Sequence, residues 1–225
     1  MKIFIDGGTN LFQGLTQFHG QFHFDSTWQI YCFEANPETY QMALKRIPSW
    51  LQPLNFQVLN QALADQAGTV TVNCASADDS CMQYYDGVLW KNLARRGVGK
   101  IRRLMGISPH TNQGSNILEK PPERHGDHIF RYKPYTVEAI DLGALVESFA
   151  PQQPEKLIIK LDIEGAEFQV LDRLFQSPGI HLISEMYVEF HERYFQEKEE
   201  AYRQKKLGYF QQAANLNSLM LQEWH

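Results

Sequence analysis

Short apolar runs that end in polar or glycine-rich turns recur along the first third of the chain. Lys2–Asp6, Gln29–Glu34 and Leu54–Ala62 each predict a buried strand, because they are short, apolar and bounded by turn residues. Apolar and polar residues alternate in Thr69–Cys74, which is typical of a half-exposed strand. This part of the chain therefore predicts four strands.

Helices are predicted between the first three strands. Thr9 or Asn10 can cap a helix that runs to about His19. Asn36 is placed to cap a second helix that begins at Pro37, where the missing N–H group costs nothing.

The last third of the chain repeats this alternation. Leu157–Asp162 and His181–His191 predict strands, and the apolar spacing within Phe168–Phe175 predicts a helix between them. Arg193–Lys206 is highly charged and predicts a helix with a solvated outer face.

Tyr209–Ala214 and Leu219–Trp224 predict a closing antiparallel hairpin. The whole pattern predicts one α/β domain over residues 1–225, with a doubly wound, mostly parallel sheet between two layers of helices. Residues 75–132 break the pattern with turn-forming and charged residues, so we expect an insertion of short helices and loops that serves as a lid or binding region. Ligands of such sheets bind at the carboxyl ends of the strands.

The composition excludes several classes of protein. A net charge of −5 and 43% hydrophobic residues indicate a folded chain, and they disfavour a general nucleic-acid coat protein, which would be strongly basic. Cys32, Cys74 and Cys81 are an odd, sparse set, so we expect reduced thiols and a cytoplasmic location. No run of 18 apolar residues occurs, so we expect no membrane span.

The first predicted strand ends in Asp6-Gly7-Gly8-Thr9-Asn10. Glycines let the backbone approach a ligand, and N–H groups at a helix start can bind a carboxylate or phosphate. The spacing is neither the dinucleotide fingerprint nor a phosphate-binding P-loop. The alternative is a tight turn without a ligand.

Two further strand ends carry acids. Glu34 can accept hydrogen bonds from the vicinal hydroxyls of a ribose, or it can simply contact the helix that follows. Lys160 and Asp162 lie on one face of their strand, and a lysine there is rarely buried without a partner. The alternative for this end is a structural ion pair, with Glu164 and Glu167 as acids at the start of a helix.

Four motifs together resemble the FkbM-type S-adenosylmethionine-dependent methyltransferases of class I. They are Asp6-Gly7-Gly8-Thr9-Asn10, Phe33-Glu34-Ala35-Asn36-Pro37, Asn60-Gln61-Ala62-Leu63-Ala64-Asp65 and, most distinctively, Lys160-Leu161-Asp162-Ile163-Glu164-Gly165-Ala166-Glu167. The resemblance implies a Rossmann-like sheet of seven strands with a reversed last hairpin. It also implies methyl transfer from S-adenosylmethionine to a hydroxyl of a saccharide or small metabolite.

The resemblance also assigns cofactor-binding residues. Asp6 and the backbone of Gly7, Gly8, Thr9 and Asn10 would hold the methionine end. Glu34 would bind the ribose, and the adenine would lie beside Ala35 and against Gln61 and Ala62. Asp162 and, from a loosely similar Gly114-Ser115-Asn116 stretch, Asn116 would complete the set.

A hydroxyl acceptor is a poor nucleophile, so a positioned base would assist its attack. Glu189 and His191 share a face of their predicted strand and lie near its carboxyl end, as Asp162 does on the neighbouring strand. We predict His191 or Asp162 as general base, with Glu189 orienting the base or the substrate. A metal site of Asp162, Glu189 and His191 is chemically allowed, but we expect no metal.

Lys91–Arg103 contains six basic residues and no acid. It is either a solvated helix face or a patch that attracts an anionic acceptor such as an acidic glycan or RNA, on which Trp90, Tyr84 and Tyr85 could stack. The main alternatives to small-molecule methylation are therefore methylation of a nucleic acid or protein, and a non-catalytic nucleoside-binding module. The oligomeric state stays open.

Overall fold

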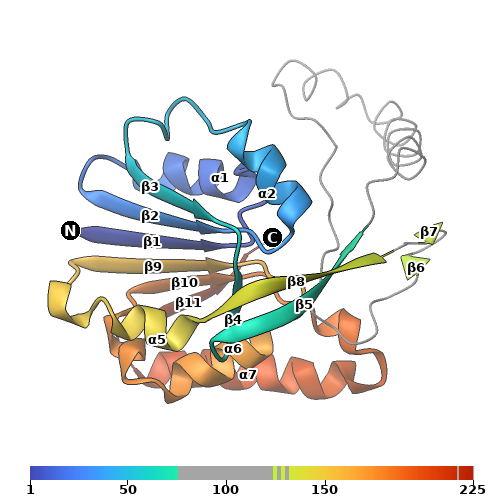
Figure 1. Ribbon diagram of the computed structural model, residues 1–225. Coiled ribbons are helices and arrows are strands. Elements are labelled where there is room, and N and C mark those ends of the chain that lie inside the picture. Colours follow the sequence, from blue (N-terminus) through green and yellow to red (C-terminus); the bar gives the residue numbers. More distant parts are fainter. Residues whose placement is uncertain (76–123, 126–127, 130–131, 217, 225) are drawn as a thin grey trace, which may run out of the picture.

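The centre of the structure, a computed structural model that describes residues 1–75, 124–125, 128–129, 132–216 and 218–224, is a sheet of six strands. Their order is β11-β10-β9-β1-β2-β3, and every neighbouring pair is parallel (Figure 1). The strands are β1 (Lys2–Gly7), β2 (Trp28–Phe33), β3 (Asn55–Leu59), β9 (Lys156–Leu161), β10 (Glu185–Val188) and β11 (Met220–Glu223). The predicted α/β class is confirmed, but the expected seven strands are wrong, since the described central sheet has six.

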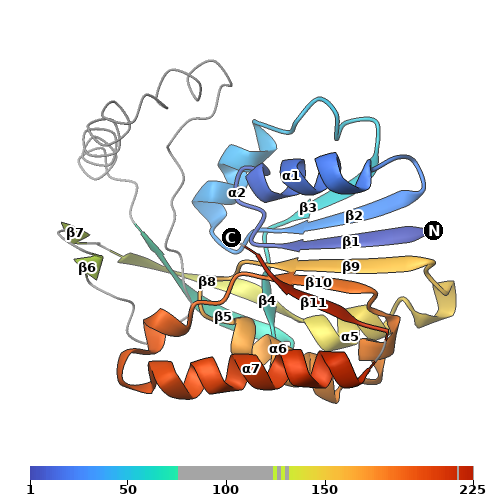
Figure 2. The ribbon, with the colours of Figure 1, turned by 180° about the vertical axis from the view of Figure 1, so that it is seen from behind.

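Helices cover both faces of this sheet. α1 (Gln13–Phe22) and α2 (Pro37–Leu44) lie on one side, and α5 (Leu142–Glu147), α6 (Glu167–Gln176) and α7 (Glu199–Asn215) lie on the other (Figures 1 and 2). Successive residues of a strand point to opposite faces, so Phe4 packs in the core under α1, whereas Ile3 and Ile5 pack in the core under α5–α7. This confirms the predicted three layers.

A second, three-stranded sheet follows β3. It has the order β4-β8-β5 and consists of β4 (Ala62–Ala64), β8 (Tyr132–Asp141) and β5 (Gly68–Ala75). The third predicted strand, Leu54–Ala62, is therefore wrong as one element, because the chain leaves the central sheet after Leu59 and joins the second sheet at Ala62. β6 (Arg124–His125) and β7 (His128–Ile129) form a separate pair, and most of the predicted insertion at 75–132 lies outside the described residues.

The predicted closing hairpin is wrong. α7 continues to Asn215, and β11 then pairs in parallel with β10 (Figure 2). Tyr209 and Ala213 are four positions apart on the buried side of α7 and belong to the same core. The Tyr209 ring packs against Phe168 and Phe190. Burial of that helical face explains why Tyr209–Ala214 does not form a strand.

Three short 3-10 helices complete the described fold: η1 (Ala150–Gln152), η2 (Pro178–Leu182) and η3 (Glu192–Lys198). η2 and β10 replace most of the longer strand predicted for His181–His191. η3 and α7 together replace the single helix predicted over Arg193–Lys206. The side chains of this segment are exposed or partly exposed where the structure describes them.

The two predicted helix starts have opposite outcomes. The Asn36 side chain accepts from the backbone N–H groups of Glu38 (2.9 Å) and Thr39 (3.3 Å), which confirms that cap. α1 begins later than predicted, after Phe12. Thr9 and Asn10 do not cap it, because both take part in contacts with acids at the strand ends.

Candidate active site at the carboxyl ends of the central strands

A buried lysine holds the glycine turn that follows β1. β1 and β9 pair with Asp6 opposite Lys160, and the Lys160 ammonium lies 3.3 Å from Asp6 Oδ1 and 3.6 Å from Asp162 Oδ2. It also donates to the carbonyls of Gly7 (3.1 Å) and Gly8 (2.9 Å). Burial alone would lower the pKa of Lys160, but the charges of Asp6 and Asp162 outweigh it and raise that pKa. The predicted pairing of Lys160 with nearby acids is confirmed.

Gly8 is the point at which the turn touches the end of β9. Its φ is +74°, and a Cβ added to it would lie 1.8 Å from the carbonyl oxygen of Asp162. Only glycine fits such a backbone conformation and such a close approach. The backbone N–H groups of Gly8 and Thr9 both donate to the carbonyl of Phe33, so contacts within the chain already use these two donors.

Glu34 connects the same turn to the end of β2. Its two carboxylate oxygens accept from the backbone N–H groups of Asn10 (2.9 Å) and Asn36 (2.8 Å). Burial raises the pKa of Glu34 to about 7, although these two hydrogen bonds act in the opposite direction. Because an ionised carboxylate has about four acceptor positions, Glu34 retains acceptor capacity for a ligand.

Two acceptor atoms of the turn lack a hydrogen-bond donor within the described part of the chain. They are Oδ1 of Asn10 and Oδ1 of Asp6, whose nearest charge is the Lys160 ammonium. A buried polar atom without a hydrogen bond is costly and often marks a ligand position. The side-chain hydroxyl of Thr9 donates to the other Asp6 oxygen at 2.7 Å.

The residues expected beside an adenine lie where β2 and β3 end. Asn60 donates to the backbone carbonyls of Glu34 (2.8 Å) and Ala35 (3.2 Å), which fastens the two ends together. Ala62 packs with Ala35 in a small core, and the Gln61 amide donates to Glu138 at 2.7 Å. Contact of Ala35, Gln61 and Ala62 with an adenine stays a prediction. Asn116 and Lys91–Arg103 lie outside the described residues.

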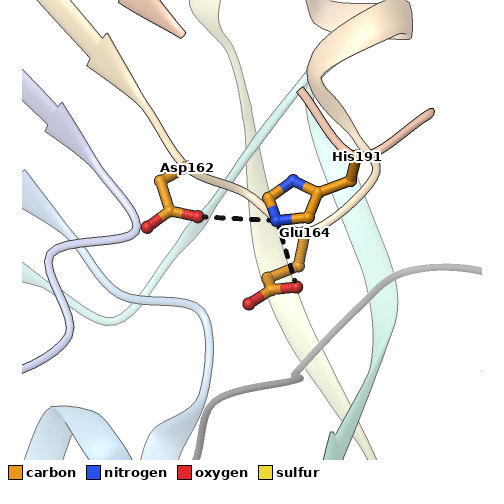
Figure 3. A group of neighbouring side chains, drawn as sticks. All are labelled: Asp162, Glu164 and His191. Carbon is orange, nitrogen blue, oxygen red and sulfur yellow. Dashed lines mark ion pairs between the residues drawn. The ribbon is translucent and has the colours of Figure 1, made fainter. Parts of the chain in front are cut away.

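A second group of charged side chains surrounds His191, just after β10. Nε2 of the imidazole lies 3.5 Å from Glu164 and 4.0 Å from Asp162 (Figure 3). It also lies 3.7 Å from Glu189. On the other side of the ring, Nδ1 lies 2.9 Å from Glu167. The structure therefore brings together the three residues predicted for catalysis and adds two acids of the Lys160–Glu167 motif.

This surrounding charge changes the proton affinity of the imidazole. Burial alone would lower the pKa of His191, but its bond to Glu167 and the charges of Glu164 and Asp162 raise it to about 9. His191 thus carries a proton at neutral pH in this state and cannot accept another. Its role as general base stays a prediction that requires prior loss of that proton. Burial also raises the pKa of Glu164 and Glu189.

The sequence interpretation missed what Glu167 and Glu164 do. Glu167 is fully buried and accepts from the backbone N–H groups of Ile163 and Gly165, while it holds His191. Glu164 has a φ of +54° and accepts a 2.5 Å hydrogen bond from the Tyr194 hydroxyl. The Glu-Gly pair at 164–165, typical of a tight turn, was the available signal that these acids fold back rather than only begin a helix.

The family model described as the methyltransferase FkbM domain matches residues 18–220, which is most of the chain. No curated protein and no solved structure matches. Among the described residues, none of the helices has the length and apolar character needed to span a bilayer.

Proposed function

The chain belongs to the FkbM methyltransferase family, and we propose that it transfers a methyl group from S-adenosylmethionine to a hydroxyl of a saccharide or another small metabolite. When bound, S-adenosylmethionine supplies a methyl group made electrophilic by its sulfonium. We also propose a cytoplasmic location, because three sparse cysteines are not the pattern of a disulfide framework.

The observation that carries the proposal is the convergence of three strand ends on one glycine turn. Asn10 donates to Glu34 at the end of β2, and Gly8 lies against the carbonyl of Asp162 at the end of β9. In parallel α/β sheets this edge, at the carboxyl ends of the strands, is where ligands bind.

The polar atoms of this turn fit the donor molecule. Oδ1 of Asn10, which lacks a donor, can accept from the ammonium of a methionine moiety. The remaining acceptor positions of Glu34 can accept from ribose hydroxyls. The Lys160 ammonium holds the glycine carbonyls in place, so the turn does not depend on the ligand for its shape.

The acceptor side of the proposed reaction is the acid group around His191. Methyl transfer to oxygen requires alignment of the hydroxyl and removal of its proton. Asp162 and Glu189 are half-buried, with 26% and 27% of their side chains exposed, so both are open to a bound acceptor. We propose that one of these carboxylates takes the proton.

Calorimetry with S-adenosylhomocysteine tests the donor site. Glu34→Ala is expected to weaken binding by about 1.5–3 kcal/mol, because charge-assisted hydrogen bonds are lost. Glu155→Ala is the matched control: this acid is 69% exposed and pairs with Lys2 at 3.9 Å at the amino end of the sheet. Unchanged affinity in Glu34→Ala would contradict the ribose role.

A radiolabelled methyl-transfer assay against a panel of saccharides and small alcohols tests the reaction itself. Label is expected in at least one hydroxyl acceptor. Binding of S-adenosylhomocysteine without transfer to any acceptor in the panel, or to RNA or protein, would instead support a non-catalytic nucleoside-binding module.

A further inference from the structure

Four acidic side chains surround His191, and we call this group the cage. We propose that Asp162, Glu164 and His191 bind a divalent first-row metal cation. Binding of the ion does not depend on the proposed function, but the role suggested for it below rests on that function.

The positions of the three side chains suit one ion. One donor atom from each residue can be chosen so that all lie within 4.8 Å of one another, and Figure 3 shows both carboxylates directed to the same ring nitrogen. Nε2 lies 3.5 Å from Glu164 Oε2 and 4.0 Å from Asp162 Oδ1. Ligands at the usual bond lengths from a shared ion are roughly 3.0–4.2 Å apart, so small side-chain movements would complete the site.

The burial and orientation of His191 are an observation separate from Asp162 and Glu164. Its side chain is only 2% exposed, and the fully buried Glu167 holds Nδ1 at 2.9 Å. Nε2 is thereby directed into the cage, where its described contacts are ion pairs at 3.5–4.0 Å and no hydrogen bond is present among described residues. A carboxylate behind a histidine is the arrangement that fixes the tautomer and orientation of a metal-binding imidazole.

The excess of negative charge around His191 also favours a bound cation. Four carboxylates, those of Asp162, Glu164, Glu167 and Glu189, lie within 4.0 Å of one imidazole. Among the described residues, Lys160 pairs with Asp162 but is shared with Asp6, and the Arg193 guanidinium acts on Glu189. Negative charge that is partly removed from water needs compensation. A divalent cation that takes the place of the Nε2 proton of His191, which is released to solvent, provides more positive charge than that proton does.

Two carboxylate oxygens and one imidazole nitrogen suit ions such as Mn²⁺, Fe²⁺ and Zn²⁺. Asp162 and Glu164 are 26% and 22% exposed, so both carboxylates are accessible to a bound ion and to an acceptor. If the proposed methyl transfer is correct, an acceptor hydroxyl bound there would be polarised by the ion. Glu189, which is outside the three-residue set, would then be the carboxylate that takes its proton.

Manganese binding to the chelator-treated full chain tests the site, measured from the loss of the free Mn²⁺ electron paramagnetic resonance signal. One ion per chain is expected, displaced by Zn²⁺. Glu164→Gln and His191→Gln are each expected to weaken Mn²⁺ binding at least tenfold. Glu192→Gln is the matched control, because this nearby acid pairs with Lys206 at 2.9 Å and is outside the cage.

Circular dichroism and S-adenosylhomocysteine binding on the same samples separate the possible failures. Glu164→Gln is the decisive variant, since its side chain is partly exposed and its loss leaves the Glu167–His191 pair intact. No bound Mn²⁺ in the native chain, or equal binding by folded Glu164→Gln and Glu192→Gln, would overturn the metal site. A native chain that binds Mn²⁺ but does not bind S-adenosylhomocysteine would overturn the proposed function and leave the metal site standing.

Discussion

The pH dependence of donor binding follows from the burial of Glu34. Its pKa is raised to about 7, so much of this carboxyl is protonated in the free protein at neutral pH. Ribose hydroxyls that donate to Glu34 favour its ionised form and return the pKa toward its ordinary value. Affinity for S-adenosylhomocysteine is therefore expected to increase as the pH rises and then to level off above the pKa.

The size of the effect follows from the ionised fraction. With a pKa of about 7, that fraction grows from about one tenth at pH 6 to about nine tenths at pH 8. Affinity should rise about tenfold over this interval, which corresponds to about 1.4 kcal/mol. At pH 6, binding should also release about 0.9 proton.

Titration calorimetry at pH 6, 7 and 8, in buffers of different ionisation enthalpy, measures the affinity and the proton release together. Glu34→Gln cannot ionise, so its affinity should be lower and independent of pH in this range. Glu155→Gln should keep the native profile, because this exposed acid lies at the other end of the sheet. A native profile that is flat, or that falls with pH, would refute the reasoning.

Two further changes test how the site is held, and a third tests how α7 is held on the core. Lys160→Met should lower the free energy of unfolding by about 3–5 kcal/mol in urea titrations, because Asp6 would remain as a buried charge without its partner. Gly8→Ala should fold poorly, since its Cβ would collide with the Asp162 carbonyl, whereas Gly20→Ala, with nothing within 4 Å, should melt at or above the native temperature. Tyr209→Phe should lower the free energy of unfolding by about 1–2 kcal/mol, because the single hydroxyl proton is shared between the Phe168 backbone carbonyl and Asp172 Oδ1, each at 2.8 Å; an unchanged urea midpoint would contradict this.

The local pattern of apolar and polar residues predicted single strands and one helix cap correctly. β1, β2, β5 and β9 lie within a residue or two of their predictions, and Asn36 caps α2 as expected. The hairpin failed because Tyr209–Ala214 has residues that suit either a strand or a helix. Packing of Tyr209 against Phe168, Phe175 and Phe190 decided for the helix.

The amino-acid sequence alone determined the α/β class, the family resemblance and the acids at the strand ends, because these depend on period-two and helical patterns and on contiguous motifs. Only the tertiary structure decided which of these acids surround His191. Glu167 and His191 are 24 positions apart and meet only because β9 and β10 are adjacent and the 164–165 turn folds back. The sequence pattern does not show that these two side chains meet, since contacts between separate strands depend on how the whole sheet is assembled.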